Sequence, residues 1–234
     1  MNSLKQVCYF FFLIVALGSC TQKTPVKIEK ATAQQKTPSQ PVNDTIRLHE
    51  LKKLFVTGDF DGDGTKDTLF QHNFSRLTGT EIEFSADPFQ NEWDTVVYWF
   101  FRQESDVYLA LNKTKRDTLH LGPAQGLYCL INVGDNNADG KDEIAFVIDH
   151  LDFSNVNSCR IYSLCKGKWT ELQQFGIHEG SFSYTSDEPP VFREIEEFLE
   201  KQNGRWLYKD YSKNDYESAE EVGKMLPLKP GRCR

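Results

Sequence analysis

The sequence predicts an all-β domain of short antiparallel strands, and three observations carry this prediction. The apolar runs after residue 44 are short and rich in Val, Ile, Tyr, Phe and Trp, which favour strands. Turn residues separate these runs, and Lys166-Gly167-Lys168 and Asn203-Gly204 each stand between two runs as in a β-hairpin. A pattern of Asp and Gly occurs twice, each time between two strand-like runs.

Most of the expected strands follow directly from these runs. Outside the Asp-rich segments they are Glu81–Phe84, Thr95–Phe101, Val107–Leu111 and Thr118–Leu121, then a hairpin of Cys159–Cys165 with Trp169–Phe175.

The segment around Asn203-Gly204 allows two interpretations. Phe192, Ile195, Phe198 and Leu199 follow helical spacing, which would give a short helix ending at Gly204. The Asn-Gly pair favours a strand pair instead, Glu196–Lys201 with Arg205–Tyr211. We take the strand pair as the expectation.

The two Asp-rich segments form an internal repeat. The segments Leu54–Asp67 and Leu130–Glu143 align so that a strand-like run and a glycine precede a loop with acid or amide side chains at positions 1, 3 and 5. Glycine follows at position 6 and an acid at position 9, and an apolar run resumes after it. The loops begin 76 residues apart, and we find no third copy.

This spacing suits a hard cation. Ca²⁺ takes six to eight oxygen ligands, and alternate residues of a tight loop can direct their carboxylates to one point. Glycine at position 6 permits the sharp turn. Without a cation, several carboxylates so close together would repel one another. The alternative is a pair of Asp/Gly hairpin turns without metal.

The loops differ from EF-hands and resemble another repeat. Position 12, which is a bidentate acid in an EF-hand, is Phe70 in one loop and Phe146 in the other, and the flanks are strand-like. The pattern resembles the FG-GAP and VCBS repeats of integrin-type β-propellers and bacterial surface proteins. There a Gly-Asp-x-Asn/Asp-Gly-Asp-Gly-x-x-Asp/Glu loop joins two strands of a blade and binds calcium.

The resemblance implies two calcium sites. The first is Asp59, Asp61, Asp63, Thr65 through its carbonyl, and Asp67. The second is Asp135, Asn137, Asp139, Lys141 through its carbonyl, and Glu143. It also implies antiparallel strands in propeller-blade-like units. A closed propeller needs four to eight four-stranded blades, so this chain is too short for a full one.

The N-terminal residues predict export and lipid attachment. An apolar run from Val7 to Leu17 spans about 16 Å as a helix, about half of a bilayer's hydrocarbon core. Leu17-Gly18-Ser19-Cys20 resembles the lipobox of bacterial lipoproteins, whose cysteine is acylated after cleavage. We therefore expect a signal peptide over 1–19, lipidated Cys20 and a flexible polar tether over 20–44, and a β domain over 45–234.

These features define the expected setting and partners. The resemblance places the chain in a bacterial cell envelope, attached to a membrane through its lipid and either periplasmic or surface-exposed. After removal of residues 1–19 the chain has 26 basic and 34 acidic residues, a net charge of −8, without a basic stripe. Nucleic acid is therefore not an expected partner. A protein or glycan partner stays unidentified.

Four cysteines remain for the exported domain. Cys159 and Cys165 have the same parity on one expected strand and lie apart if that strand is straight. The expectation is therefore a bridge from Cys129 to one of these two. Free buried thiols are the alternative, and Cys233 completes the set.

No enzyme signature is present in the sequence. It contains no GxSxG, HExxH, P-loop or GxGxxG motif. The segment Asp149–Asp152, which places His150 between two acids, is the only one that suggests another site. The preferred function is a calcium-binding envelope lipoprotein that acts as a binding or structural module. The alternative is an envelope hydrolase with structural calcium.

The lipobox resemblance makes a direct prediction. The wild-type protein should incorporate labelled fatty acid and sediment with membranes, because Cys20 follows Leu17-Gly18-Ser19 after an apolar run. Cys20→Ala should abolish both properties, whereas Cys159→Ala should retain them. Recovery of the wild type wholly in the soluble fraction, with residues 1–19 removed, would show that the interpretation is wrong.

Overall fold

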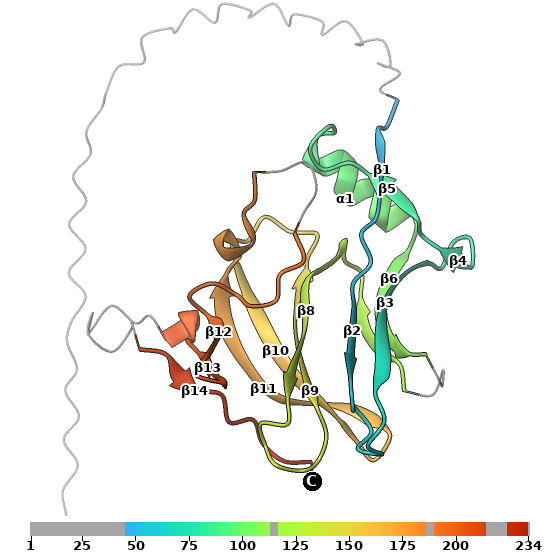
Figure 1. Ribbon diagram of the computed structural model, residues 1–234. Coiled ribbons are helices and arrows are strands. Elements are labelled where there is room, and N and C mark those ends of the chain that lie inside the picture. Colours follow the sequence, from blue (N-terminus) through green and yellow to red (C-terminus); the bar gives the residue numbers. More distant parts are fainter. Residues whose placement is uncertain (1–44, 113–116, 186–189, 214–223, 234) are drawn as a thin grey trace, which may run out of the picture. The chain divides into compact units, whose positions relative to one another are not determined.

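Antiparallel strands make up most of the regular secondary structure in this computed structural model, which describes residues 45–112, 117–185, 190–213 and 224–233 (Figure 1). These residues belong to one unit, Asp44–Arg234. The predicted all-β class is confirmed, and the sheets of the described residues close into neither a barrel nor a propeller. The expected signal peptide, Cys20 and tether lie outside the described residues.

The first large sheet begins at the first Asp-rich segment. Its path is β2 (Phe55–Gly58), β3 (Asp67–Ser75), β6 (Ser105–Leu111) and β7 (Leu119–Gly122), with β4 (Thr80–Glu81) paired to the end of β3. All pairs are antiparallel. Buried residues of β3 alternate with residues that are half-buried or, at Phe70, exposed, so one face of the strand is more fully covered than the other.

The second large sheet begins at the second Asp-rich segment. It is an antiparallel meander of β8 (Gly126–Gly134), β9 (Glu143–Asp149), β10 (Val156–Cys165) and β11 (Lys168–His178). Each large sheet therefore starts with strand, Asp-rich loop and strand, and continues through two further antiparallel strands, which is the blade-like unit expected. The predicted hairpin around Gly167 is confirmed.

The hydrophobic core lies on both faces of the second sheet. On one face, Leu69 and Leu109 of the first sheet pack with Ile144 and Phe146 of β9. On the other face, Val147 packs within a cluster that also holds residues of β12 (Leu199–Gln202) and β13 (Arg205–Tyr208). Because both its faces are covered, β9 is buried over nearly its whole length. Its sequence is accordingly an almost continuous apolar run.

The smaller elements complete the structure. They are β1 (Leu48–Glu50) paired with β5 (Phe84–Ala86), β14 (Leu226–Pro227) paired with β13, α1 (Trp93–Arg102), and the 3-10 helices η1 (Glu179–Phe182) and η2 (Tyr211–Lys213).

The predicted strand pair around Asn203-Gly204 is confirmed. β12 pairs with β13, and these two residues, which both have positive φ, form the turn between them. The run Glu81–Phe84 is split between β4 and β5.

The strand predicted at Thr95–Phe101 is wrong, because these residues belong to helix α1. Its β-branched and aromatic composition suggested a strand, but Val96 and Phe100 are the buried residues and stand four apart, one helical turn. Asp94 in the first turn and Arg102 in the last turn complement the helix dipole. Packing of one helical face thus outweighed the strand propensity of the side chains.

The predicted cysteine pairing is also wrong. Cys165 at the end of β10 is bonded to Cys233, and Cys129 and Cys159 are free and buried. Cys129 in β8 and Cys159 in β10 each lie opposite Val147 of β9, on the two sides of that strand. Their Cα atoms are therefore about 9.6 Å apart, which is two strand spacings. A disulfide requires Cα atoms within roughly 7 Å of each other, so these two cysteines are too far apart to form one.

None of the helices in the described ranges is long and apolar enough to cross a membrane.

The two large sheets meet closely at Gly58, which predicts a sensitive position. A Cβ at Gly58 would lie 2.5 Å from Asn132 Nδ2 and 2.7 Å from Asp142 Oδ2 of the second repeat. Gly58→Ala should therefore lower the free energy of unfolding by about 1–3 kcal/mol through overpacking. Denaturant unfolding measures this loss.

The matched control is Gly231→Ala, where the nearest atom to an added Cβ is the Leu172 carbonyl oxygen at 3.8 Å. It should be close to neutral. Equal stability of the two variants would contradict the close packing at Gly58.

Candidate metal centre

The two Asp-rich loops lie side by side at the same end of the large sheets (Figure 1). The first joins β2 to β3 and the second joins β8 to β9. In both loops the glycine at position 6, Gly64 or Gly140, has positive φ, near 82°, a conformation in which a Cβ would be strained. The predicted role of these two glycines in the turn is therefore confirmed.

The first loop is organised by its own carboxylates. Asp59 accepts hydrogen bonds from the amides of Gly62 and Gly64, both at 2.9 Å. Asp61 accepts from the Asp63 amide at 3.0 Å, and Asp63 accepts from the Thr65 amide at 2.7 Å. Carboxylate oxygens of Asp59, Asp61 and Asp63 lie within 4.8 Å of one another.

The outer residues of this loop are less completely gathered. Asp67, the predicted fourth carboxylate, is buried at the start of β3 but is not part of the 4.8 Å group. Thr65 is exposed. The ligand role of both residues stays a prediction.

The second loop repeats this arrangement. Asp135 accepts from the amides of Asp139 and Gly140, at 3.2 and 2.9 Å. Asp139 Oδ1 accepts from the Lys141 amide at 3.2 Å. Asp135, Asp139 and Glu143 offer carboxylate oxygens within 4.8 Å of one another. The structure thus brings together three of the five residues predicted for this site.

The other two predicted residues have identifiable positions. The Asn137 side-chain amide donates to the Gly231 carbonyl at 3.1 Å, and the Arg232 side chain donates to the Asn137 carbonyl at 2.9 Å. The Lys141 ammonium donates to the Leu164 carbonyl at 2.7 Å, and the predicted role of the Lys141 carbonyl as a ligand stays a prediction. Because Cys233 is bonded to Cys165, the C-terminal segment is held against this loop.

Three buried oxygens of the second loop have no hydrogen-bond donor among the described residues. Asn137 Oδ1, Asp139 Oδ2 and Glu143 Oε1 are inaccessible to solvent and accept no hydrogen bond from any described residue. The other carboxylate oxygen of Asp139 and that of Glu143 each accept a loop amide, from Lys141 and Asn136. A buried acceptor without a partner costs about 1–3 kcal/mol, and more when it is charged. A cation contacting these oxygens would remove that cost.

Glu143 is the most buried acid of the second site. Its side chain is fully inaccessible, and this burial, together with the charges of Asp135 and Asp139, raises its pKa from 4.5 to about 7. The hydrogen bonds from Asn136 oppose the shift. The first loop differs, because Asp61 and Asp63 are exposed. The second site is therefore better shielded from water.

Two residues that the sequence interpretation missed connect the loops. Asp142 donates its amide to the Asp59 carbonyl at 2.8 Å, and its carboxylate accepts from the Asp59 amide at 3.1 Å. Asn132 donates to the same carboxylate at 2.8 Å and to the Thr57 carbonyl at 2.9 Å. The repeat alignment offered one signal, since Asp142 stands opposite Lys66 and so breaks the repeat at a position outside the ligand set.

No family model, curated protein or solved structure matches the chain. The resemblance to FG-GAP and VCBS repeats therefore rests on the two loop motifs.

The elevated pKa of Glu143 predicts opposite pH dependences with and without calcium. Because the folded pKa lies above the unfolded one, the contribution of Glu143 to stability without metal is present below about pH 4.5 and is lost as pH rises through about 7. Calcium binds the ionised carboxylate, so the stabilisation by calcium should grow over the same interval. Melting temperatures in chelator and in excess calcium, measured across this interval, test both trends.

Glu143→Gln should flatten the trend measured in chelator, whereas Glu194→Gln, which changes an exposed acid outside both loops, should leave it unchanged. A calcium-induced shift of equal size at acidic and neutral pH would contradict the assignment.

Proposed function

We propose that this chain is a calcium-binding, membrane-anchored envelope lipoprotein that acts as a binding or structural module. The observation that carries the calcium assignment is the set of three buried oxygens in the second loop, on Asn137, Asp139 and Glu143, that accept no hydrogen bond from described residues. The membrane anchor is supported by the motif ending at Cys20, and its protein or glycan partner stays open.

The ligand chemistry favours calcium over other metals. Both clusters consist of carboxylates, without His or Cys, so zinc and copper are poorly suited. The loops gather ligands from alternate residues of a turn, which suits the flexible six to eight oxygen shell of Ca²⁺. Mg²⁺ requires a smaller and nearly ideal octahedron and should bind more weakly.

The proposed role of the ions is to stabilise the junction of the two large sheets. Asp142 joins the loops by a reciprocal pair of hydrogen bonds with the backbone of Asp59. Asp142 also neighbours Glu143, and Asp59 is the first acid of the other cluster. A cation bound to either cluster would therefore reduce the repulsion between carboxylates on both sides of this junction.

One observation favours the alternative, an envelope hydrolase with structural calcium. A cavity remote from both loops contains Asp149, whose pKa is raised to about 7, mainly by burial. Hydrolysis of a glycosidic bond by acid catalysis usually needs two carboxyl groups at the same space. Asp149 is the only acid among the described residues that line this cavity, so a non-catalytic module is the better supported function.

The calcium assignment predicts a large thermal shift. A ligand that binds only the folded state stabilises it by about 2.7 kcal/mol at a hundred times its Kd. For a domain of this size each kcal/mol corresponds to roughly 2–4 °C, so one saturated site should raise the melting temperature by about 5–11 °C.

Asp63→Ala and Asp139→Ala should each reduce this calcium-induced shift, and the double variant should remove it. The effect of Asp139→Ala should be the larger one, because the second site is better shielded from water.

Glu194→Ala, which removes an exposed acid far from both loops in sequence, is the matched control and should keep the full shift. Identical melting temperatures of the wild type in chelator and in excess calcium would show that the loops are turns without metal.

A further inference from the structure

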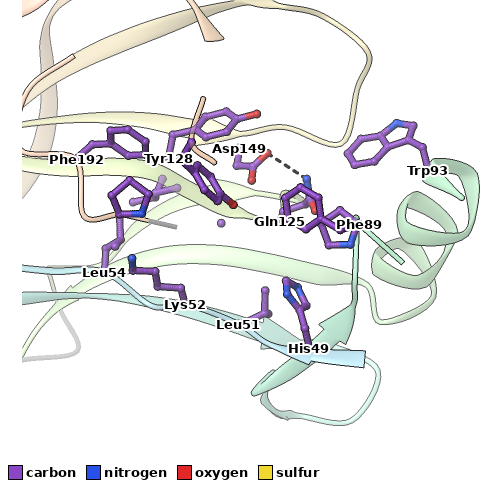
Figure 2. A pocket seen from close by; sticks show the side chains of 15 residues that line it. His49, Leu51, Lys52, Leu54, Phe89, Trp93, Gln125, Tyr128, Asp149 and Phe192 are labelled. Atoms are coloured by element: carbon purple, nitrogen blue, oxygen red, sulfur yellow. Dashed lines mark hydrogen bonds between the residues drawn. The ribbon is translucent and has the colours of Figure 1, made fainter. Parts of the chain in front are cut away.

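A cavity lies at the opposite end of β8 and β9 from the second Asp-rich loop. Its volume is about 290 Å³, and it is bounded by residues of β1, the loop before α1, the start of β8, the end of β9 and the segment around Tyr184 (Figure 2). β8 has nine residues and separates the cavity from the loop by roughly 26 Å. The cavity is therefore a separate site, into which the segment Asp149–Asp152 contributes Asp149.

Aromatic side chains form much of the cavity wall. They are Phe89, Trp93, Tyr128, Tyr184 and Phe192. Figure 2 shows Asp149 between Tyr128 and Phe192 on one side and Phe89 and Trp93 on the other. Phe89 is 78% exposed, although it lies in edge contact with Tyr184 at 6.5 Å between ring centroids. Such exposure of a large ring at the mouth of a cavity is typical of a binding site.

The polar centre of the cavity is the carboxyl group of Asp149. Asp149 Oδ1 accepts from the Gln125 side-chain amide at 3.1 Å. Burial, together with the charges of Glu179 and Asp152, raises the pKa of Asp149 to about 7, and the hydrogen bonds from Tyr128 and Gln125 oppose this shift. The Tyr128 hydroxyl donates to Glu179 at 3.2 Å, which places a second carboxylate directly behind the wall.

The basic side chains that line the cavity are turned to other groups. His49 Nε2 lies 3.1 Å from the Ser85 hydroxyl. In Figure 2 the Lys52 ammonium is directed toward the side of Leu54 and Phe192, whereas Asp149 faces Gln125. The space beside the Asp149 carboxylate is therefore bounded by rings and an amide.

We propose that this cavity binds a small organic ammonium ion, with Asp149 as its counter-ion and the faces of the surrounding aromatic rings as its walls. The π-face of an aromatic ring attracts a cation, and the attraction is strongest where both are removed from water. A buried carboxylate gains from a cation for the same reason. An anionic ligand would meet repulsion from Asp149 and Glu179, and a neutral ligand would lack the ionic attraction to the Asp149 carboxylate.

A pair of isosteric probes tests the requirement for positive charge. Choline and 3,3-dimethylbutan-1-ol have the same shape, but a carbon atom replaces the quaternary nitrogen in the alcohol. Binding of each to the full-length chain is measured by calorimetry and by fluorescence of the tryptophans. Choline should bind about 10-fold more tightly than the alcohol, within the range of cation–π contributions.

Two variants assign the binding to this cavity. Asp149→Asn keeps the size of the side chain but removes the counter-ion, so it should reduce the preference for choline over the alcohol to the few-fold that the aromatic rings supply. Glu194→Gln, which neutralises an exposed acid that does not line the cavity, is the matched control and should keep the preference. Phe89→Ala removes a ring that is mostly exposed, so it should fold normally and weaken choline binding; it decides the test if Asp149→Asn fails to fold.

Several results would overturn the proposal. They are equal affinity of the wild type for choline and the alcohol, no saturable binding of choline, preferential binding of neutral sugars, and an unchanged preference in folded Asp149→Asn. Calcium removal offers an independent check, since the two sites are separate, and choline binding to folded protein in chelator would stand even if the loops held no metal.

Discussion

The junction of the two large sheets depends on how the acidic oxygens of the Asp-rich loops are compensated. Each loop brings three carboxylates within 4.8 Å, and the loops are themselves joined through Asp142 and the backbone of Asp59. Amide donors of the loops satisfy many of these oxygens. They do not satisfy the three innermost oxygens of the second loop, to which no described residue donates. The arrangement is therefore suited to a cation, and Asp59, whose backbone joins the two loops, is one of the residues that would hold it.

The loops and the hairpins could be predicted from the sequence because their determinants are local. Alternating acids and a glycine at position 6 define the loop without reference to the rest of the chain, and Gly140 has the positive φ that this position requires. Asn203-Gly204 likewise identified the β12–β13 hairpin against the competing helical spacing. The spacing of Val96 and Phe100 was available in the sequence too, but the aromatic and β-branched residues around them concealed it.

The other features that were missed depend on contacts between distant segments. The bond between Cys165 and Cys233 requires the C-terminal segment to reach the end of β10, which no local pattern specifies. The role of Asp142 requires the two loops to be side by side. The cavity around Asp149 is assembled from segments between His49 and Phe192, so the sequence could only single out the segment Asp149–Asp152 and could not show its aromatic surroundings. The two ends of β8 and β9 thus hold acidic side chains in different surroundings, a cluster within one loop at one end and Asp149 in a cavity formed by tertiary packing at the other.

The number of calcium ions that the full-length chain binds tests the central claim most directly. Calorimetric titration of calcium into protein first treated with chelator measures this number without reference to stability. Extracellular calcium sites commonly bind at about 10⁻⁴ to 10⁻³ M, so the titration must extend well beyond that range. We predict saturation at two ions per chain, reduced to one by Asp139→Ala. Titration without saturable calcium binding would contradict the account.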